Sequence, residues 1–158
     1  MDNAYVSARF RARRQLVNRV VRNAADWAAG VQDIRSAIVV GSYAYGRPRM
    51  SSDVDLVFLT DDVEKHLESL DFVSAIVAPR STLVRSAQWG PMHERRVRQP
   101  GGLVVEFGIT TCAWMDQPVD PGTARVVADG CKILYDQDLV SAALVSLGLV
   151  AERWTPVS

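Results

Sequence analysis

The chain has 158 residues, 48% of them hydrophobic, enough for one compact domain (residues 1–158) whose core needs no disulfide or structural zinc. Its 18 Lys and Arg residues balance its 18 Asp and Glu residues, which gives no strong signal for nucleic-acid binding. No apolar run approaches the length of a membrane span, no signal peptide is evident, and two cysteines form no metal-ligand pattern. We therefore expect a soluble, cytoplasmic protein with no membrane partner.

The first part of the chain shows helical spacing of apolar residues from about residue 5 to residue 29, and Gly30 ends the pattern. Residues such as Val17 and Trp27 share one face, whereas arginines occupy the rest of the first half. We expect an amphipathic helix over residues 5–29 that packs on the rest of the domain.

Two strands are predicted next. Residues 38–40 form a short apolar run that ends at Gly41, as in a buried strand. After a loop that contains Gly46, residues 53–59 carry acidic residues on one face and apolar residues on the other. This alternation predicts a strand with one solvated end.

The middle of the chain is interpreted as a helix followed by further extended segments. Residues 61–70 resemble a capped helix with His66 on its surface, and residues 72–77 form a β-rich run. Residues 92–98 and 103–110 are predicted to form a hairpin around a Pro-Gly turn.

The last third of the chain completes the predicted fold, with a helix at 123–129, a strand at 132–135 and a helix at 139–147. Strands and helices mix along the chain, and the hairpin breaks their alternation. We therefore expect an α/β (α+β) fold with a mixed β-sheet flanked by helices.

A pair of aspartates marks the most informative segment. Asp53 and Asp55 are two residues apart on a predicted strand, so both carboxylates leave the same face, roughly 7 Å apart along the chain. Neighbouring carboxylates repel each other unless a cation lies between them. Because Mg²⁺ prefers oxygen ligands and is usually bound by one or two carboxylates and substrate phosphates, the pair predicts a metal–triphosphate site.

Gly41 and Ser42 follow directly on the predicted buried strand. A glycine at a sharp turn lets the next backbone N–H groups approach an anion closely, and the serine adds a hydroxyl donor. The segment lacks the Lys-Ser/Thr that follows the glycines in the phosphate loop of ATPases. It therefore predicts a different kind of phosphate-binding turn.

Glu106 is the only charged residue in an otherwise apolar strand of the hairpin. A lone carboxylate there is costly unless it binds a cation or lies at an open edge, and Gly108 beside it leaves room for a ligand. This strand could lie beside residues 53–59, which would bring three carboxylates together. The nearby Arg95, Arg96 and Arg98 could help to bind substrate, but we interpret them as a solvated strand edge.

The spacing Gly41-Ser42, Gly46, Ser52-Asp53-Val54-Asp55-Leu56 resembles the signature of the nucleotidyltransferase superfamily with the polymerase-beta-like fold. The chain is most similar to the minimal and antibiotic-modifying members, and the resemblance extends over residues 34–136. Two positions depart from the family pattern: Tyr45 stands where many members have Arg, and the third acid is Glu106 where Asp is common.

The resemblance implies an enzyme that transfers a nucleoside monophosphate from a nucleoside triphosphate to an unknown hydroxyl acceptor and releases pyrophosphate. Asp53, Asp55 and Glu106 would be the catalytic residues and would hold two Mg²⁺ ions. Gly41 and Ser42, with Arg47, would bind the phosphates.

Two other functions remain open at this point. The chain could be a minimal nucleotidyltransferase module of the antitoxin type that acts on a toxin partner, or a nucleotide-binding domain without turnover. A homodimer is also possible. One motif serves all of these functions, so the sequence leaves the acceptor, the base preference and the partner open.

Overall fold

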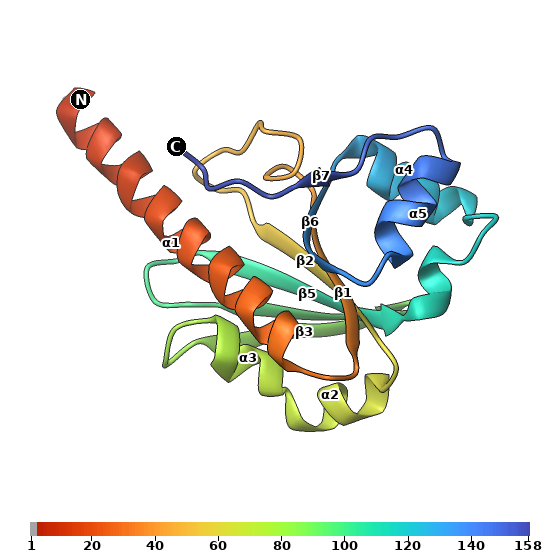
Figure 1. The fold of residues 1–158 in the computed structure, drawn as a ribbon. Coiled ribbons are helices and arrows are strands. Elements are labelled where there is room, and N and C mark those ends of the chain that lie inside the picture. The colour runs from red at the N-terminus through yellow and green to blue at the C-terminus, as the bar shows by residue number, and fades with distance from the viewer. Residues whose placement is uncertain (1–2) are drawn as a thin grey trace.

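The computed structural model describes residues 3–158, with side chains from residue 8 onward. Figure 1 shows a sheet with helices on both faces. The elements in chain order are α1 (Asn3–Gly30), β1 (Ile34–Val40), β2 (Val54–Thr60), α2 (Val63–Ser69), α3 (Asp71–Ile76), β3 (Thr82–Trp89), β4 (Met92–Arg98), β5 (Val104–Thr111), the 3₁₀ turn η1 (Cys112–Met115), α4 (Pro121–Asp129), β6 (Cys131–Asp136), α5 (Leu139–Ser146) and β7 (Glu152–Arg153).

The sheet has seven strands in the order β3-β4-β5-β2-β1-β6-β7. Strand β2 pairs in parallel with β5 and antiparallel with β1, and β6 pairs in parallel with β7. The predicted hairpin is formed by β4 and β5. The expected mixed sheet flanked by helices is therefore confirmed.

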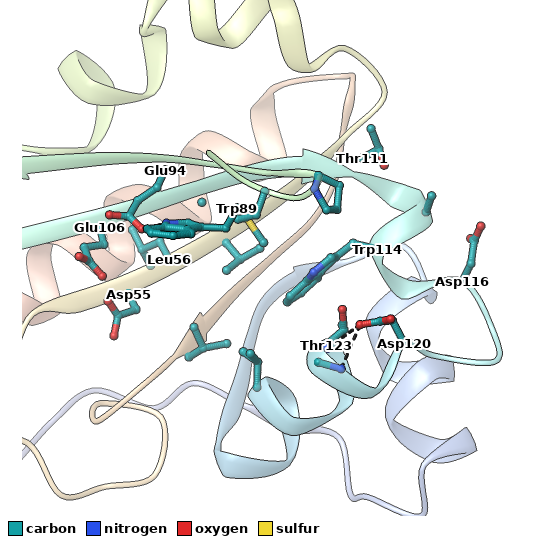
Figure 2. A pocket seen from close by; sticks show the side chains of 18 of the residues that line it. Asp55, Leu56, Trp89, Glu94, Glu106, Thr111, Trp114, Asp116, Asp120 and Thr123 are labelled. Atoms are coloured by element: carbon teal, nitrogen blue, oxygen red, sulfur yellow. Dashed lines mark hydrogen bonds between the residues drawn. The ribbon is translucent and has the colours of Figure 1, made fainter. Parts of the chain in front are cut away.

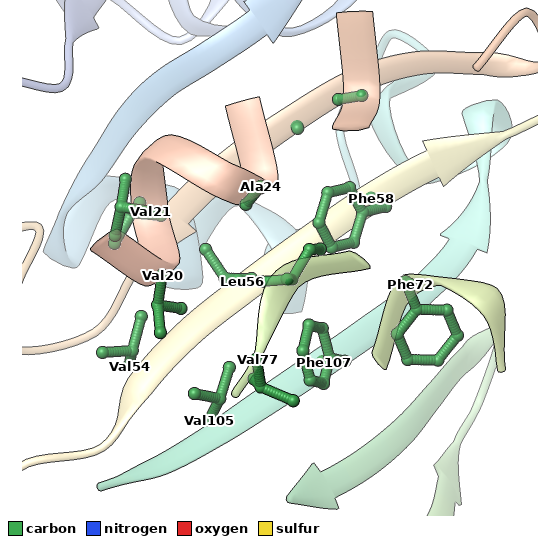
Figure 3. Close-up of a cluster of buried hydrophobic side chains, with 14 of the residues drawn as sticks. Val20, Val21, Ala24, Val54, Leu56, Phe58, Phe72, Val77, Val105 and Phe107 are labelled. Carbon is green, nitrogen blue, oxygen red and sulfur yellow. The ribbon is translucent and has the colours of Figure 1, made fainter. Parts of the chain in front are cut away.

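One face of the sheet packs against α1 and α3 (Figure 3). Alternate residues of β2 point toward these helices, because side chains of a strand alternate between its two faces. The core on this side includes Val54, Leu56 and Phe58 of β2, Val105 and Phe107 of β5, Val20, Val21 and Ala24 of α1, and Phe72 of α3. The helix predicted over residues 5–29 thus contributes a major part of this core.

The opposite face of the sheet is only partly covered. Here α4, α5 and η1 pack on β1, β6 and the end of β2, and Val57 and Leu59 of β2 belong to this second core. Asp55 shares this face with Val57 but lies at the end of β2 that these helices leave open (Figures 1 and 2). The same strand therefore anchors the core and presents a carboxylate outside it.

Residues 72–77, predicted as a β-rich run, instead form α3. Phe72 and Ile76 are four residues apart and both are buried, so one helical turn puts them on the same side. The short length of the run made its apolar content ambiguous between strand and helix.

Strand β3 had no sequence signal. It lies at the edge of the sheet, and nearly all of its residues are exposed, including Leu83, Val84 and Trp89. An edge strand exposed on both faces has no need for apolar alternation.

Within the described residues, no helix has the length and apolar character required to cross a bilayer.

Candidate active site

Asp55 and Glu106 lie side by side on the partly covered face of the sheet (Figure 2). The parallel register of β2 and β5 pairs Asp55 with Glu106, just as it pairs Val54 with Val105. The expectation that the second hairpin strand lies next to the Asp53–Asp55 segment is therefore fulfilled. Two carboxylates from distant parts of the sequence meet at one point of the sheet.

Asp53 joins these carboxylates through an arginine. The Arg96 guanidinium donates from Nη2 to Asp53 Oδ2 at 2.8 Å and from Nη1 to Glu106 Oε1 at 2.5 Å. Arg96 is the direct antiparallel partner of Glu106 across the β4–β5 hairpin. The interpretation of Arg96 as part of a solvated edge is therefore wrong: its side chain is 32% exposed and bridges two of the three predicted carboxylates.

The positive charge of Arg96 does not balance the negative charges of the three carboxylates when all of them are ionised. Burial raises the pKa of Asp55 to about 8, and the hydrogen bond and negative charge of Glu106 act in the same direction. Burial also raises the pKa of Asp53, although the positive charge of Arg96 partly opposes this shift. The cluster therefore favours a proton or another cation near Asp55.

Gly41 brings the preceding strand into contact with this cluster. Its φ is +73°, in the left-handed region that favours glycine, and an added Cβ would collide with Asp55 Oδ2. A turn follows, in which Ala44 N–H donates to Gly41 O at 2.9 Å and Arg47 N–H donates to Ser42 O at 3.2 Å. Gly41 thus lies against Asp55 and Ser42 follows it in the turn, whereas the Arg47 side chain is exposed on the following loop.

The chemistry of these side chains fits magnesium. All three provide hard oxygen donors, and the Arg96 guanidinium bridges two of them, Asp53 and Glu106. In residues 8–158, however, no three His, Cys, Asp or Glu side chains are already arranged as ligands of one metal ion. The three carboxylates therefore suit Mg²⁺ by their chemistry. In the structure, the Arg96 guanidinium lies between the carboxylates of Asp53 and Glu106 and sets the distance between them.

A cavity of about 890 Å³ opens next to Asp55 and Glu106 (Figure 2). Trp89 and Glu94 line it from the β3–β4 hairpin, and Trp114 lines it from η1. Its five acidic lining residues are Asp55, Glu94, Glu106, Asp116 and Asp120, and no Lys or Arg of the described chain is among the residues that line it. The cavity thus combines two indole rings with a strongly acidic wall.

The contact between Arg96 and the carboxylates was not predicted, although the register of the predicted hairpin pairs Arg96 with Glu106. With the hairpin turn centred on Gly101, residues whose numbers add to 202 face each other, which pairs Arg96 with Glu106 and Arg98 with Val104. Trp89, Pro91 and Trp114 also line the cavity. His93 lies within β4 and is not among the lining residues.

Comparison with protein families gives one finding. The family model for the nucleotidyltransferase domain matches residues 20–98, which is half of the chain. The matched segment contains Gly41, Ser42, Asp53, Asp55 and Arg96, and it ends before Glu106. None of the curated proteins matches the chain.

Proposed function

The chain belongs to the nucleotidyltransferase domain family, and from that premise we propose that it is a Mg²⁺-dependent enzyme that transfers a nucleoside monophosphate from a nucleoside triphosphate to a hydroxyl acceptor. One observation carries the proposal. Asp55 and Glu106 lie side by side, with Asp53 linked to them, at the mouth of a cavity and against the Gly41 turn.

Asp53, Asp55 and Glu106 would hold the metal, with two ions as the expected number. When bound, Mg²⁺ supplies charge neutralisation and Lewis-acid activation at the phosphates. The high pKa of Asp55 supports this role, because a carboxyl that is costly to ionise alone gives up its proton when a cation approaches. The protein thus provides ligands whose negative charge requires a cation.

The Gly41–Ser42 turn would bind the departing phosphates. The lack of a side chain at Gly41 keeps the turn in contact with Asp55, so phosphates on the turn would lie next to the carboxylates. The Ser42 hydroxyl and the N–H groups of the turn are donors of the kind that bind phosphate oxygens. Arg47, which is exposed on the loop, would close over the phosphates from the solvent side.

The acceptor would occupy the cavity. Its acidic wall disfavours a triphosphate, whereas Trp89 and Trp114 offer apolar surfaces for the body of an acceptor. An acceptor hydroxyl at the mouth would lie next to Glu106, whose carboxylate would accept its proton. The acceptor oxygen then forms a bond to the α-phosphorus, and the bond from that phosphorus to pyrophosphate breaks.

The test is incubation of the full chain with labelled nucleoside triphosphates and a panel of hydroxyl acceptors, with transferred label read by mass. Asp53→Asn and Asp55→Asn are expected to reduce transfer by about a thousandfold or more, because each removes a metal ligand from the reacting centre. Asp26→Asn, an exposed position on α1, is the matched control and should transfer at the wild-type rate.

Two outcomes would contradict the proposal. Transfer by both aspartate variants at the wild-type rate would remove the carboxylates from the mechanism. Wild-type protein that binds Mg²⁺–triphosphate but transfers label to no acceptor would instead favour the antitoxin-type partner module or a nucleotide-binding domain without turnover.

A further inference from the structure

Arg96 lies between two of the carboxylates that are proposed to hold metal. Its guanidinium binds Asp53 and Glu106 at the same time, and its charge also acts on Asp55. Both of its partners are partly buried: the side chains of Asp53 and Glu106 are 24% and 25% exposed. A positive charge held among partly desolvated carboxylates interacts with them more strongly than it would on an open surface.

We propose that Arg96 is a resident counter-ion that competes with divalent metal for Asp53 and Glu106 and transfers to the triphosphate when the metal-bound nucleotide enters. The inference rests on the proposed function, because it takes Asp53 and Glu106 to be metal ligands. It adds a residue to that function and predicts that metal binds weakly without nucleotide and tightly with it.

The geometry of the Arg96 contacts supports this competition with metal. Each of the two guanidinium nitrogens takes one carboxylate oxygen, and with this pairing the described acids form no group that could hold one metal ion. Mg²⁺ demands near-octahedral coordination at short distances, which two carboxylates turned toward a guanidinium do not offer. Binding of metal therefore requires Arg96 to leave at least one carboxylate.

The positive charge of Arg96 also supports this competition. A guanidinium and a divalent cation in the same cluster repel each other, so either disfavours the other. A triphosphate removes this conflict, since it provides oxygens that a guanidinium binds as readily as carboxylates. The cavity side of the cluster has no Lys or Arg among its described lining residues, and Arg96 already reaches the carboxylates that would hold the metal-bound triphosphate.

The test measures Mn²⁺ binding by electron paramagnetic resonance, with and without a non-hydrolysable nucleoside triphosphate. The full-length wild type is compared with Arg96→Gln and Arg95→Gln. Arg95 is the matched control, because it carries the same charge on the same strand but occupies a position on the other face of the sheet, opposite Phe107. Circular dichroism and Tm confirm that each variant is folded.

Without nucleotide, Arg96→Gln is expected to bind Mn²⁺ about tenfold or more tightly than wild type, because the competing cation is gone. Its affinity for the triphosphate analogue should fall by about tenfold. Arg95→Gln should change neither by more than about twofold. Opposite changes for two ligands in one variant distinguish the competition from misfolding, which would weaken both.

Equal Mn²⁺ affinity in wild type and Arg96→Gln, or weaker binding by the variant, would overturn the inference and leave the proposed transferase intact. Absence of Mn²⁺ binding by every form, even with the analogue present, would overturn both the inference and the proposed function.

Discussion

The two ends of β2 lie next to two acidic clusters that differ in how well their negative charge is compensated. At the end near Asp55, one guanidinium bridges two of three carboxylates, Asp53 and Glu106, and the pKa values of Asp53 and Asp55 are raised. At the other end, Asp33 accepts hydrogen bonds from Thr60 and Lys65 and pairs with His66, which also binds Asp71. The first cluster has one guanidinium for three carboxylates, whereas Asp33 in the second, saturated cluster is surrounded by hydrogen-bond donors.

The pKa of Asp33 shows the difference. Its burial would raise that pKa, but the hydrogen bonds from Lys65, Thr60 and His66 outweigh burial and hold it well below the ordinary value. His66 is fully buried, so its expected position on a helix surface is wrong; it connects α2 to the start of α3 and to the segment before β1. The saturated cluster stabilises the fold, and the unsaturated one is available for a ligand.

The largest expected effect breaks the saturated cluster. His66→Ala removes the partner of two aspartates and leaves a cavity beside Trp27, whose ring centroid lies 5.3 Å from that of the imidazole. The unfolding free energy should fall by about 3 kcal/mol, measured by urea denaturation. Mn²⁺ binding by the folded fraction should not change.

Lys65→Ala is the companion variant, because it removes an exposed partner of the same Asp33. It should lower the unfolding free energy much less than His66→Ala does, because solvent screens an exposed ion pair. A loss of Mn²⁺ affinity in His66→Ala that exceeds its loss of folded protein would show that the two ends of β2 are not independent.

The next effect has the opposite sign. The folded-state pKa of Asp55 is about 8 against an ordinary 3.8, so metal-free protein loses stability as pH rises between these values. Asp55→Asn removes this cost and should raise the unfolding free energy near pH 7.5 in the presence of EDTA. We expect a gain of about 2 kcal/mol, less than the pKa shift alone would give, because the substitution also alters the hydrogen bond between Asp55 and Glu106. Thermal unfolding is the measurement, and Asp26→Asn should shift it little; a destabilised Asp55→Asn would show that the carboxylate is structural.

The smallest effect is the pH dependence of the saturated cluster. The partners Asp71 and Asp33 raise the pKa of His66 above 6.5 even though burial lowers it. The stabilisation is therefore complete below pH 6.5 and is lost as pH rises through the folded-state pKa. The difference in unfolding free energy between the parent and His66→Ala should shrink from pH 6 to pH 9.

That comparison is best made with Asp55→Asn in both proteins, because Asp55 titrates in the same range. A difference that stays constant with pH would mean that His66 is neutral in the folded protein, and that its two hydrogen bonds rather than its charge hold the cluster.

The sequence predicted the parts of the site that have a local pattern. Asp53, Asp55 and the Gly41 turn belong to one continuous motif, and the lone charge of Glu106 stands out in an apolar strand. The sequence also suggested that the strand with Glu106 lies beside residues 53–59, which the structure confirms, whereas the parallel direction of this pairing was not predicted. The membership of the nucleotidyltransferase domain family was likewise predictable from the motif.

The features that were missed depend on partners distant in the sequence. His66 is buried because Asp33 and Asp71 neutralise it, and nothing in residues 61–70 indicates either partner. The α3 helix was mistaken for a strand because six residues do not show a clear period. Arg96 is one of three arginines within four residues, and only the register of the hairpin distinguishes it from the others.

The parallel β2–β5 pair has a consequence for synthesis of the protein. Parallel strands cannot be joined by a tight turn, and about fifty residues separate Asp55 from Glu106, so their meeting requires closure of a long loop. A nascent chain that has left the ribosome as far as residue 98 would contain the whole family match, yet it would have neither the third carboxylate nor the strand that aligns it. Under the proposed function, affinity for metal should thus appear late in translation, after β5 has emerged.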